Sequence, residues 1–197
     1  MTIHWPVIMQ EQKRHRVKIA GLAPAQRRSE AAAPRSPTAP FLIGHGYDLH
    51  RLQPGGKLIL AGVVVSEEIS PIAHSDGDVI LHAVVDALLG ATGQGDIGEH
   101  FSNEDPRWKH APSRIFIEET YRQVQRIGYT LGNLDITLLC ERPKIAPFKP
   151  EMIEMLRQLL GNTATINIKA GTNEGCDAIG KGEAIASHAV VLLVRMA

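Results

Sequence analysis

Hydrophobic and polar residues alternate in several short stretches of the chain, with the period of two that is typical of β-strands. The first stretch covers residues 41–50, and residues 57–65 form an apolar run long enough for one or two further strands. Residues 134–140 alternate and then become apolar, and residues 165–169 and 189–194 continue the pattern. We therefore predict β-strands at these places.

Between the predicted strands, apolar residues repeat at helical spacing. Ser75 has the side chain of an N-cap and Asp78 that of a capping-box acid, so we predict that a helix starts here. Gly90 is the expected end of this helix. Its predicted core stripe consists of Leu81, Val84, Val85 and Leu88.

Two further helices complete the pattern. Ser113 is a candidate N-cap for a helix over residues 114–127, and Pro150 suits the first turn of a helix that ends at Gly161. Strands interleaved with three helices predict an α/β (α+β) domain. We expect a mixed or antiparallel sheet of about four strands, covered by helices on one face.

Residues 1–40 differ from the rest of the chain. They hold seven Lys and Arg residues against two acids, and four prolines between residues 24 and 40 interrupt any helix. We predict a disordered basic extension outside the domain formed by residues 41–197. An organellar transit peptide is the alternative, although such peptides are usually rich in serine and this segment has only two.

The remaining residues are mildly acidic, with 14 Lys and Arg against 19 Asp and Glu. This balance argues against nucleic acid as a partner. No stretch approaches the roughly 18 apolar residues of a membrane span. Cys140 and Cys176 lack a CxxC spacing and are too few for a disulfide framework, which favours a reducing compartment. We expect the bacterial cytoplasm, or a plastid if the extension is a transit peptide.

Three residues are candidate metal ligands. Asp48 and His50 are two apart in a predicted strand, so they project from the same face. His82 follows the core position Leu81, at the edge of the buried helix face. Two His and one carboxylate form a common zinc ligand set that leaves a fourth position open. Asp86, one turn further along the helix, is placed to orient His82. The alternative for each residue alone is a structural role.

Several loops have the composition of phosphate sites. Residues 74–78 precede the first helix, whose free N–H groups attract anions, although Ser75 also suits a purely structural cap. Residues 93–98 are rich in glycine, and a tight turn explains them equally well. In residues 169–175, backbone amides and Thr172 suit a phosphate, and Glu174 suits a magnesium-like ion.

A set of motifs resembles one known family, 2-C-methyl-D-erythritol 2,4-cyclodiphosphate synthase of the non-mevalonate isoprenoid pathway. The resemblance covers residues 42–197, with the motifs in family order and at nearly constant spacing. The segment with Asp48-Leu49-His50 and the later run His74-Ser75-Asp76-Gly77-Asp78 are its most specific parts. The other motifs are Gly95-Asp96-Ile97-Gly98, Gly128-Tyr129-Thr130-Leu131-Gly132-Asn133, Pro143-Lys144 and Gly182-Glu183.

The resemblance implies a lyase that converts 4-diphosphocytidyl-2-C-methyl-D-erythritol 2-phosphate into the cyclic diphosphate and CMP. It implies zinc on Asp48, His50 and His82, a second divalent ion, Mg²⁺ or Mn²⁺, on Glu174, and catalytic roles for His74 and Thr172. It also implies a homotrimer with active sites between subunits. The implied substrate-binding residues are Asp48, His50, His74, Ser75, Asp96, Ile97, Gly98, Phe101, Asp105, Cys140, Pro143, Lys144, Ile145, Ala146, Gly171, Thr172, Asn173, Glu174, Ala178 and Lys181.

The chain departs from the family pattern in two loops. Residues 171–178 replace a Thr-rich run followed by Glu-Lys-Leu-Gly-Phe, and Lys181 stands where an arginine is usual. Residues 101–105 replace Phe-Pro-Asp-Thr-Asp. Lysine acts on phosphate as a point charge, whereas arginine makes two parallel bonds. Two alternatives therefore stay open: a zinc-dependent phosphoester hydrolase and a catalytically weakened, ligand-binding homologue.

Overall fold

The alternating stretches of the sequence form β-strands in the computed structural model, which describes residues 37–197. The strands are β1 (Phe41–Pro54), β2 (Leu58–Leu60), β3 (Val63–Ser66), β4 (Ile69–Pro71), β5 (Tyr129–Leu139), β6 (Thr165–Gly171) and β7 (Ala184–Arg195). The α-helices are α1 (Val79–Thr92), α2 (Ile97–His100), α3 (Ser113–Arg126), α4 (Lys149–Leu160) and α5 (Asp177–Gly180). Short 3₁₀ helices lie at η1 (Pro106–Trp108) and η2 (Ala146–Phe148).

Five strands form one sheet in the order β4-β1-β7-β5-β6, while β2 and β3 pair separately. β5 and β6 are parallel, and the other neighbours are antiparallel. The mixed α/β class is as predicted, but the sheet has one strand more than the expected four or so. The addition is β4, which pairs with the end of β1 over only three residues, too few to show an alternating pattern.

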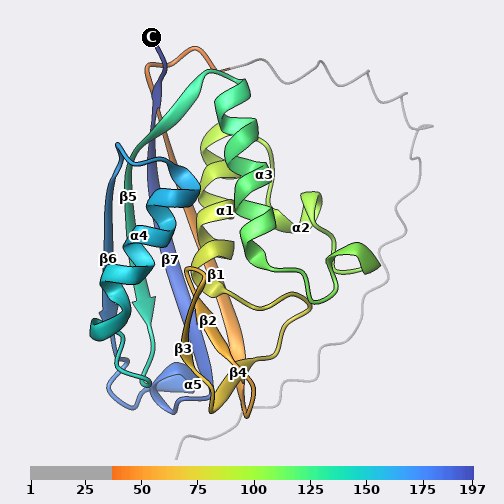
Figure 1. The fold of residues 1–197 in the computed structure, drawn as a ribbon, viewed down its shortest axis with the longest axis vertical. Helices are drawn as coiled ribbons and strands as arrows, with labels where there is room; N and C mark the ends of the chain where they lie inside the picture. Colours follow the sequence, from red (N-terminus) through yellow and green to blue (C-terminus); the bar gives the residue numbers. More distant parts are fainter. Residues whose placement is uncertain (1–36) are drawn as a thin grey trace, which may run out of the picture. The chain divides into compact units, whose positions relative to one another are not determined.

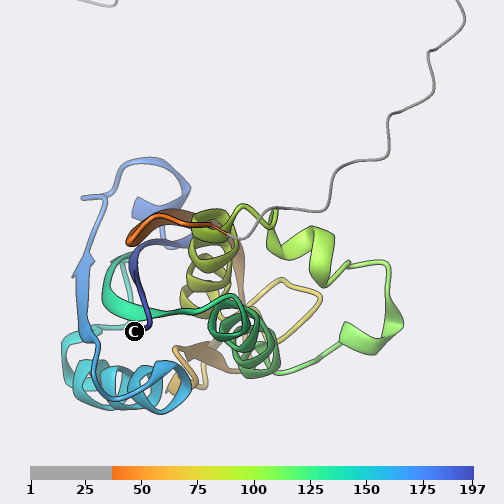
Figure 2. The same ribbon diagram turned by 90° about the horizontal axis from the view of Figure 1, so that it is seen from above.

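Helices α1, α3 and α4 cover one face of this sheet (Figures 1 and 2), whereas α5 packs Ile179 against Ala184 and Ala186 on the opposite face. The stripe predicted for α1 is confirmed, because Leu81, Val84, Val85 and Leu88 are almost fully buried. On the opposite face, β1 and β7 leave large apolar side chains exposed. None of the helices within residues 37–197 is both long and apolar enough to cross a bilayer.

The ends of α1 differ from the prediction. Asp78, and not Ser75, is the N-cap, and its carboxylate accepts hydrogen bonds from the N–H groups of Ile80 and Leu81. Gly90 does not end the helix, which continues to Thr92. The stop is Gly93, whose φ of 69° gives the left-handed conformation that often closes a helix.

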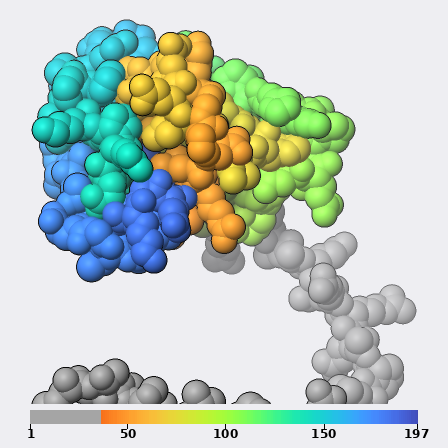
Figure 3. Space-filling model, turned by 90° about the horizontal axis from the view of Figure 1, so that it is seen from below, coloured from red at the N-terminus to blue at the C-terminus, as the bar shows by residue number. Residues whose placement is uncertain are grey.

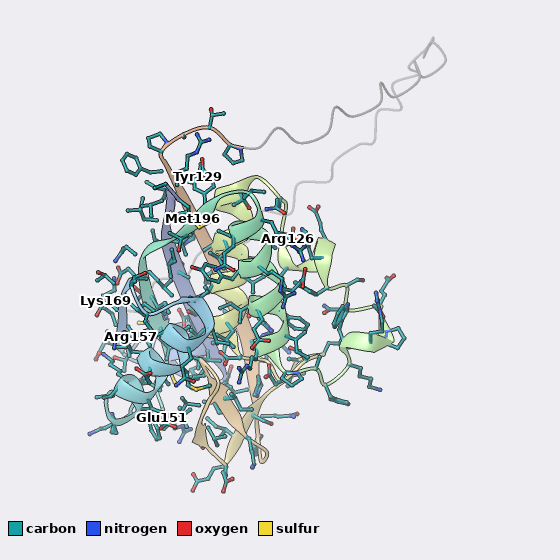
Figure 4. The ribbon with its side chains drawn as sticks, turned by 45° about the horizontal axis from the view of Figure 1, so that its top comes forward. Arg126, Tyr129, Glu151, Arg157, Lys169 and Met196 are labelled. Carbon is teal, nitrogen blue, oxygen red and sulfur yellow. The ribbon has the colours of Figure 1, made fainter. Side chains whose placement is uncertain are left out.

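The residues just before β1 contact the end of the sheet where β5 begins and β7 ends. The Tyr129 hydroxyl donates a hydrogen bond to the Ala39 carbonyl at 2.5 Å, and the Arg195 N–H donates to the Pro40 carbonyl at 3.0 Å. Figure 4 labels Tyr129 near Met196 at this end of the domain. The rest of the predicted extension, residues 1–36, lies outside the described residues.

Candidate metal centre and substrate cavity

The three predicted metal ligands meet on the helix-covered face of the sheet. Asp48 and His50 project from the same face of β1, and His82 projects from the first turns of α1. Asp48 Oδ2 lies 3.0 Å from His50 Nε2 and 2.9 Å from His82 Nδ1. The two histidine nitrogens are 3.2 Å apart. The sequence prediction that these residues come together is therefore confirmed.

Two glycines of β1 allow this approach. A Cβ on Gly46 would lie 1.9 Å from the Ala83 carbonyl oxygen, and one on Gly44 would lie 1.9 Å from that of Ala87. Both contacts are with the backbone of α1, so neither neighbour can rotate away. The helix lies directly against the strand, and His82 is thereby brought within reach of Asp48.

The donor atoms fit a tetrahedral metal ion. Bonds of about 2.0–2.1 Å to a tetrahedral zinc place neighbouring ligand atoms about 3.3 Å apart. The three separations here are 2.9, 3.0 and 3.2 Å, so the metal needs only a small expansion of the triangle. Asp48, His50 and His82 can thus hold a divalent ion and leave one position open.

The electrostatics of the centre follow from its burial and its pairing. Burial raises the pKa of Asp48, but hydrogen bonds and the charges of His50 and His82 outweigh burial and lower it overall. Burial lowers the pKa of His82, while the hydrogen bond to Asp48 and its charge raise it above the ordinary value. Asp48 is therefore an anion at neutral pH, ready to bind a cation.

The outer nitrogen of His82 faces hydroxyl groups rather than Asp86. His82 Nε2 lies 2.8 Å from Ser113 Oγ and 3.2 Å from Ser75 Oγ. Asp86 instead accepts a hydrogen bond of 2.7 Å from the N–H of Ile97, so the prediction that it orients His82 is wrong. Ser113 is not an N-cap either, because Pro112 holds that position of α3.

A cavity of about 430 Å³ opens beside the metal ligands. It brings together eight of the residues singled out in the sequence: Asp48, His50, His74, Ser75, His82, Ile97, Gly98 and Phe101. Sequence reasoning missed the rest of the lining, which is mostly apolar: Ile72, Ala73, Asn103, Trp108 and Phe116. Periodicity marks Phe116 as a helix core residue, and no motif marks Trp108.

Two residues of the loop before α1 face this cavity. His74 Nε2 is buried and has no hydrogen-bond partner in the part of the chain that the structure describes. The Ser75 hydroxyl accepts a hydrogen bond of 3.2 Å from the N–H of Gly77. Both side chains thus have donor capacity to offer a ligand in the cavity.

Asp96 and Asp105 do not line the cavity. Asp96 is the N-cap of α2 and accepts a hydrogen bond of 3.0 Å from the N–H of Glu99. Asp105 caps η1 and forms an ion pair of 2.5 Å with Arg107. A structural role accounts for both carboxylates within one chain.

The other predicted substrate residues gather elsewhere, around a second cavity of about 220 Å³. Its lining includes Cys140, Pro143, Lys144, Ile145, Ala146, Gly171 and Thr172. The Thr172 hydroxyl donates to the carboxylate of Glu174 at 2.5 Å. The side-chain amide of Asn173 donates to Asp177, and Ala178 and Lys181 are exposed beside this loop.

The two cavities lie beside different strands, the first beside β1 and the second beside β5, at the same position along the length of the sheet. Leu49 of β1 and Leu139 of β5 are both opposite Ala186 of β7. At a strand spacing of about 4.8 Å, β1 and β5 are therefore about 10 Å apart. Figure 3 shows the green segment around residue 100 on one side and the teal and blue segments around residues 145 and 180 on the other.

The comparisons with known proteins agree with this geometry. A family model described as the YgbB family matches residues 41–194. A chloroplastic 2-C-methyl-D-erythritol 2,4-cyclodiphosphate synthase of Oryza sativa subsp. japonica is 51% identical over 166 residues, which are 84% of this chain and 75% of that protein. The enzyme of that name from Pelobacter propionicus is 48% identical over 153 residues, 77% of this chain and 97% of that protein.

A solved structure leads to the same family. IspF of Plasmodium falciparum in complex with CDP superposes with a TM-score of 0.71 at 32% identity, over 80% of this chain and 97% of that one. The matches span both cavities, from β1 to β7. This chain therefore belongs to the YgbB family, the family of the 2-C-methyl-D-erythritol 2,4-cyclodiphosphate synthases.

Proposed function

We propose that this chain is a phosphorus–oxygen lyase that converts 4-diphosphocytidyl-2-C-methyl-D-erythritol 2-phosphate into 2-C-methyl-D-erythritol 2,4-cyclodiphosphate and CMP. The observation that carries the proposal is the triangle of Asp48, His50 and His82 at the mouth of a cavity. The names of relatives at about half identity supply the substrate class. Zinc is the metal proposed for this triangle, because two His and one carboxylate are a common zinc set.

The reaction needs positioning more than acid–base chemistry. An oxygen of the substrate's 2-phosphate forms a bond to the β-phosphorus, and CMP leaves with the electron pair of the broken P–O bond. The nucleophile is already ionised near neutral pH, so the protein must hold it in line and offset charge. Zinc, with Mg²⁺ or Mn²⁺ on the phosphates, would polarise the phosphate oxygens as a Lewis acid.

The residues around the first cavity suit the reacting phosphates. The unpartnered Nε2 of His74 and the hydroxyl of Ser75 can donate hydrogen bonds to developing negative charge. Ile97, Gly98 and Phe101 also line this cavity and would contact the erythritol unit.

The residues around the second cavity suit the cytidyl half of the substrate. Lys144 supplies a cation, and burial raises the pKa of the Cys140 thiol to about 11, so Cys140 stays neutral. Thr172 would donate to a phosphate, and the exposed carboxylate of Glu174 would hold the second divalent ion. The loop that bears them is also where the sequence departs most from its family.

A homotrimer would bring the two halves together. Within one chain the cavities are separate, and a neighbouring subunit can supply the second one to the first. The face of the sheet opposite α1 offers an apolar surface for such contacts, since Phe41 is 61% and Ile43 72% exposed. These observations support sites between subunits.

Mixed trimers test this arrangement. His82→Ala should remove the metal side of every site, and Thr172→Ala should impair the loop side. If one chain supplies His82 and its neighbour supplies Thr172, co-refolded mixtures regain activity above either parent, because some interfaces then carry both intact residues. A mixture no more active than its better parent contradicts the proposal.

The location of the protein depends on residues 1–40. The rice relative is named chloroplastic, which supports the transit-peptide alternative to the bacterial cytoplasm. A fusion of residues 1–40 to a fluorescent protein distinguishes the two. Import into plastids with cleavage of the segment supports a plastid, and a diffuse signal with the segment retained supports the cytoplasm.

Product analysis separates the synthase from its alternatives. A hydrolase with the same ligands would release an open phosphate, and the ³¹P spectrum distinguishes this product from a cyclic diphosphate. A weakened homologue, which the unusual residues 175–178 favour, would retain zinc and bind CMP without turnover. We expect a cyclic diphosphate and one CMP per turnover.

A further inference from the structure

Three side chains form a chain of hydrogen bonds behind the metal centre. Asp76 lies in the loop before α1, and Ser113 is the first residue of α3, 37 positions later in the sequence. The Ser113 hydroxyl donates a short hydrogen bond to Asp76 Oδ1, and the Ser113 N–H donates to Asp76 Oδ2 at 2.9 Å. On its other side, Ser113 Oγ lies 2.8 Å from His82 Nε2.

The position of each proton follows from what each group can donate. A hydroxyl has one proton, and the proton of Ser113 is donated to Asp76 Oδ1. The hydroxyl oxygen then has only lone pairs to offer His82. The contact of 2.8 Å is therefore an N–H···O bond in which His82 Nε2 carries the proton. The other nitrogen, Nδ1, lies 2.9 Å from Asp48 Oδ2, and its lone pair becomes available towards Asp48 and His50 once a metal ion replaces the proton of that hydrogen bond.

We propose that Ser113, held by Asp76, is a positioning residue that fixes the ring orientation and tautomer of His82 for metal binding. The inference rests on the proposed function, in which His82 is a metal ligand. Metal-bound histidines commonly donate their second N–H to a carboxylate or carbonyl. Here the Ser113 hydroxyl lies between His82 and the carboxylate of Asp76. The negative charge of the carboxylate therefore acts on His82 through the serine.

An ordinary structural role does not account for the Ser113 side chain. The N-cap of α3 is Pro112, which forms no side-chain cap bond, and the Ser113 hydroxyl does not cap the helix. Ser113 is fully buried, and its hydroxyl contacts Asp76 and His82. Ser75 does not replace it, because its hydroxyl is 3.2 Å from His82 Nε2 and faces the substrate cavity.

The main test compares zinc affinity among purified full-length variants, by competition with a chromogenic chelator. Ser113→Ala should weaken zinc binding about 10–100-fold, the usual effect of losing such a partner. Thr120→Val is the matched control, because it removes another buried hydroxyl of the same helix, one without a partner among residues 37–197. Its zinc affinity should equal that of the wild type.

The double variant tests whether Asp76 acts through Ser113. Asp76→Asn alone should also weaken zinc binding, but it should add nothing in the Ser113→Ala background, since coupled residues are not additive. A further loss of zinc affinity in the double variant contradicts the proposal that Asp76 acts through Ser113. Any destabilisation from the other bonds of Asp76 shows in the free energy of unfolding, and that quantity is measured for all variants.

A spectroscopic readout tests the tautomer of His82 directly. In zinc-loaded protein with ¹⁵N-labelled histidine, His82 should show a protected proton on Nε2, and this proton should exchange faster with water in Ser113→Ala. A wild-type His82 with its proton on Nδ1, or an unchanged zinc affinity in Ser113→Ala, overturns the inference. A wild-type chain that binds no zinc overturns the proposed function instead.

Discussion

Gly46→Ala tests whether the close approach of α1 to β1 builds the metal centre. The new Cβ would lie 1.9 Å from the Ala83 carbonyl oxygen, whereas ordinary contact begins at 3.4 Å, so strand and helix must separate by about 1.5 Å. Metal sites tolerate changes of about 0.2 Å in ligand distance. His82 is adjacent to Ala83, and Asp48 is two residues from Gly46. The substitution should therefore open the ligand triangle and abolish tight metal binding.

The same substitution should also destabilise the fold. Overpacking of a core typically costs about 1–3 kcal/mol, and an overlap with backbone belongs at the upper end of that range. Gly90→Ala is the matched control, because its Cβ would meet nothing nearer than 3.9 Å inside the same helix. It should raise the free energy of unfolding by about 0.4–1 kcal/mol and leave the metal site intact.

Denaturant titration gives the two stabilities, and metal analysis after dialysis gives the occupancy. The metal occupancy is compared under conditions where both variants are folded, so that a loss of metal is not a consequence of unfolding. Wild-type zinc affinity in a folded Gly46→Ala variant would refute the reasoning, since the contact would then not set the position of His82.

Three other predictions concern the same region. Asp78→Ala should lower the free energy of unfolding by about 2–4 kcal/mol in denaturant titrations, because it removes the N-cap of α1. It also leaves four N–H groups without their acceptor: the buried ones of Ala61, Ile80 and Leu81 and the partly buried one of Gly62. Zinc affinity should fall as the pH drops through the pKa of His82, which is raised above 6.5, because a proton then competes with the metal for this residue. Above that pKa the zinc affinity should become independent of pH. A flat profile of zinc affinity between about pH 5.5 and 8 argues against His82 as a ligand. Thr172→Ala should lower kcat about 10²–10³-fold at unchanged zinc content, by analogy with the loss of one transition-state donor, and unchanged turnover removes that role.

The metal ligands could be predicted from sequence because local geometry decides where they point. Strand alternation places Asp48 and His50 on one face, and helix periodicity places His82 beside the core. The meeting of the two elements could not be derived from spacing alone. This contact depends on the absence of a side chain at Gly44 and Gly46, where a Cβ would overlap the backbone of α1. The need for glycine there can be recognised only when the helix is seen against the strand.

The two errors in helix capping share a cause, since each involves a partner far away in the sequence. Ser75 has good N-cap chemistry, but the buried Asp78 carboxylate also binds the N–H groups of Ala61 and Gly62 and takes the cap position. Ser113 has the appearance of a helix cap, but its hydroxyl binds a carboxylate 37 residues away. Local pattern cannot rank such alternatives, because the competing contact forms only in the folded chain.

Turnover measured against added zinc tests the central claim most directly. Metal-free chain receives zinc in fractions of an equivalent, with Mg²⁺ and the cytidyl diphosphate substrate in excess, and the products are followed by ³¹P NMR. The account predicts that formation of the cyclic diphosphate and CMP rises linearly and levels off at one zinc per chain. Full turnover without zinc, or an open phosphate as the product at saturation, would contradict it.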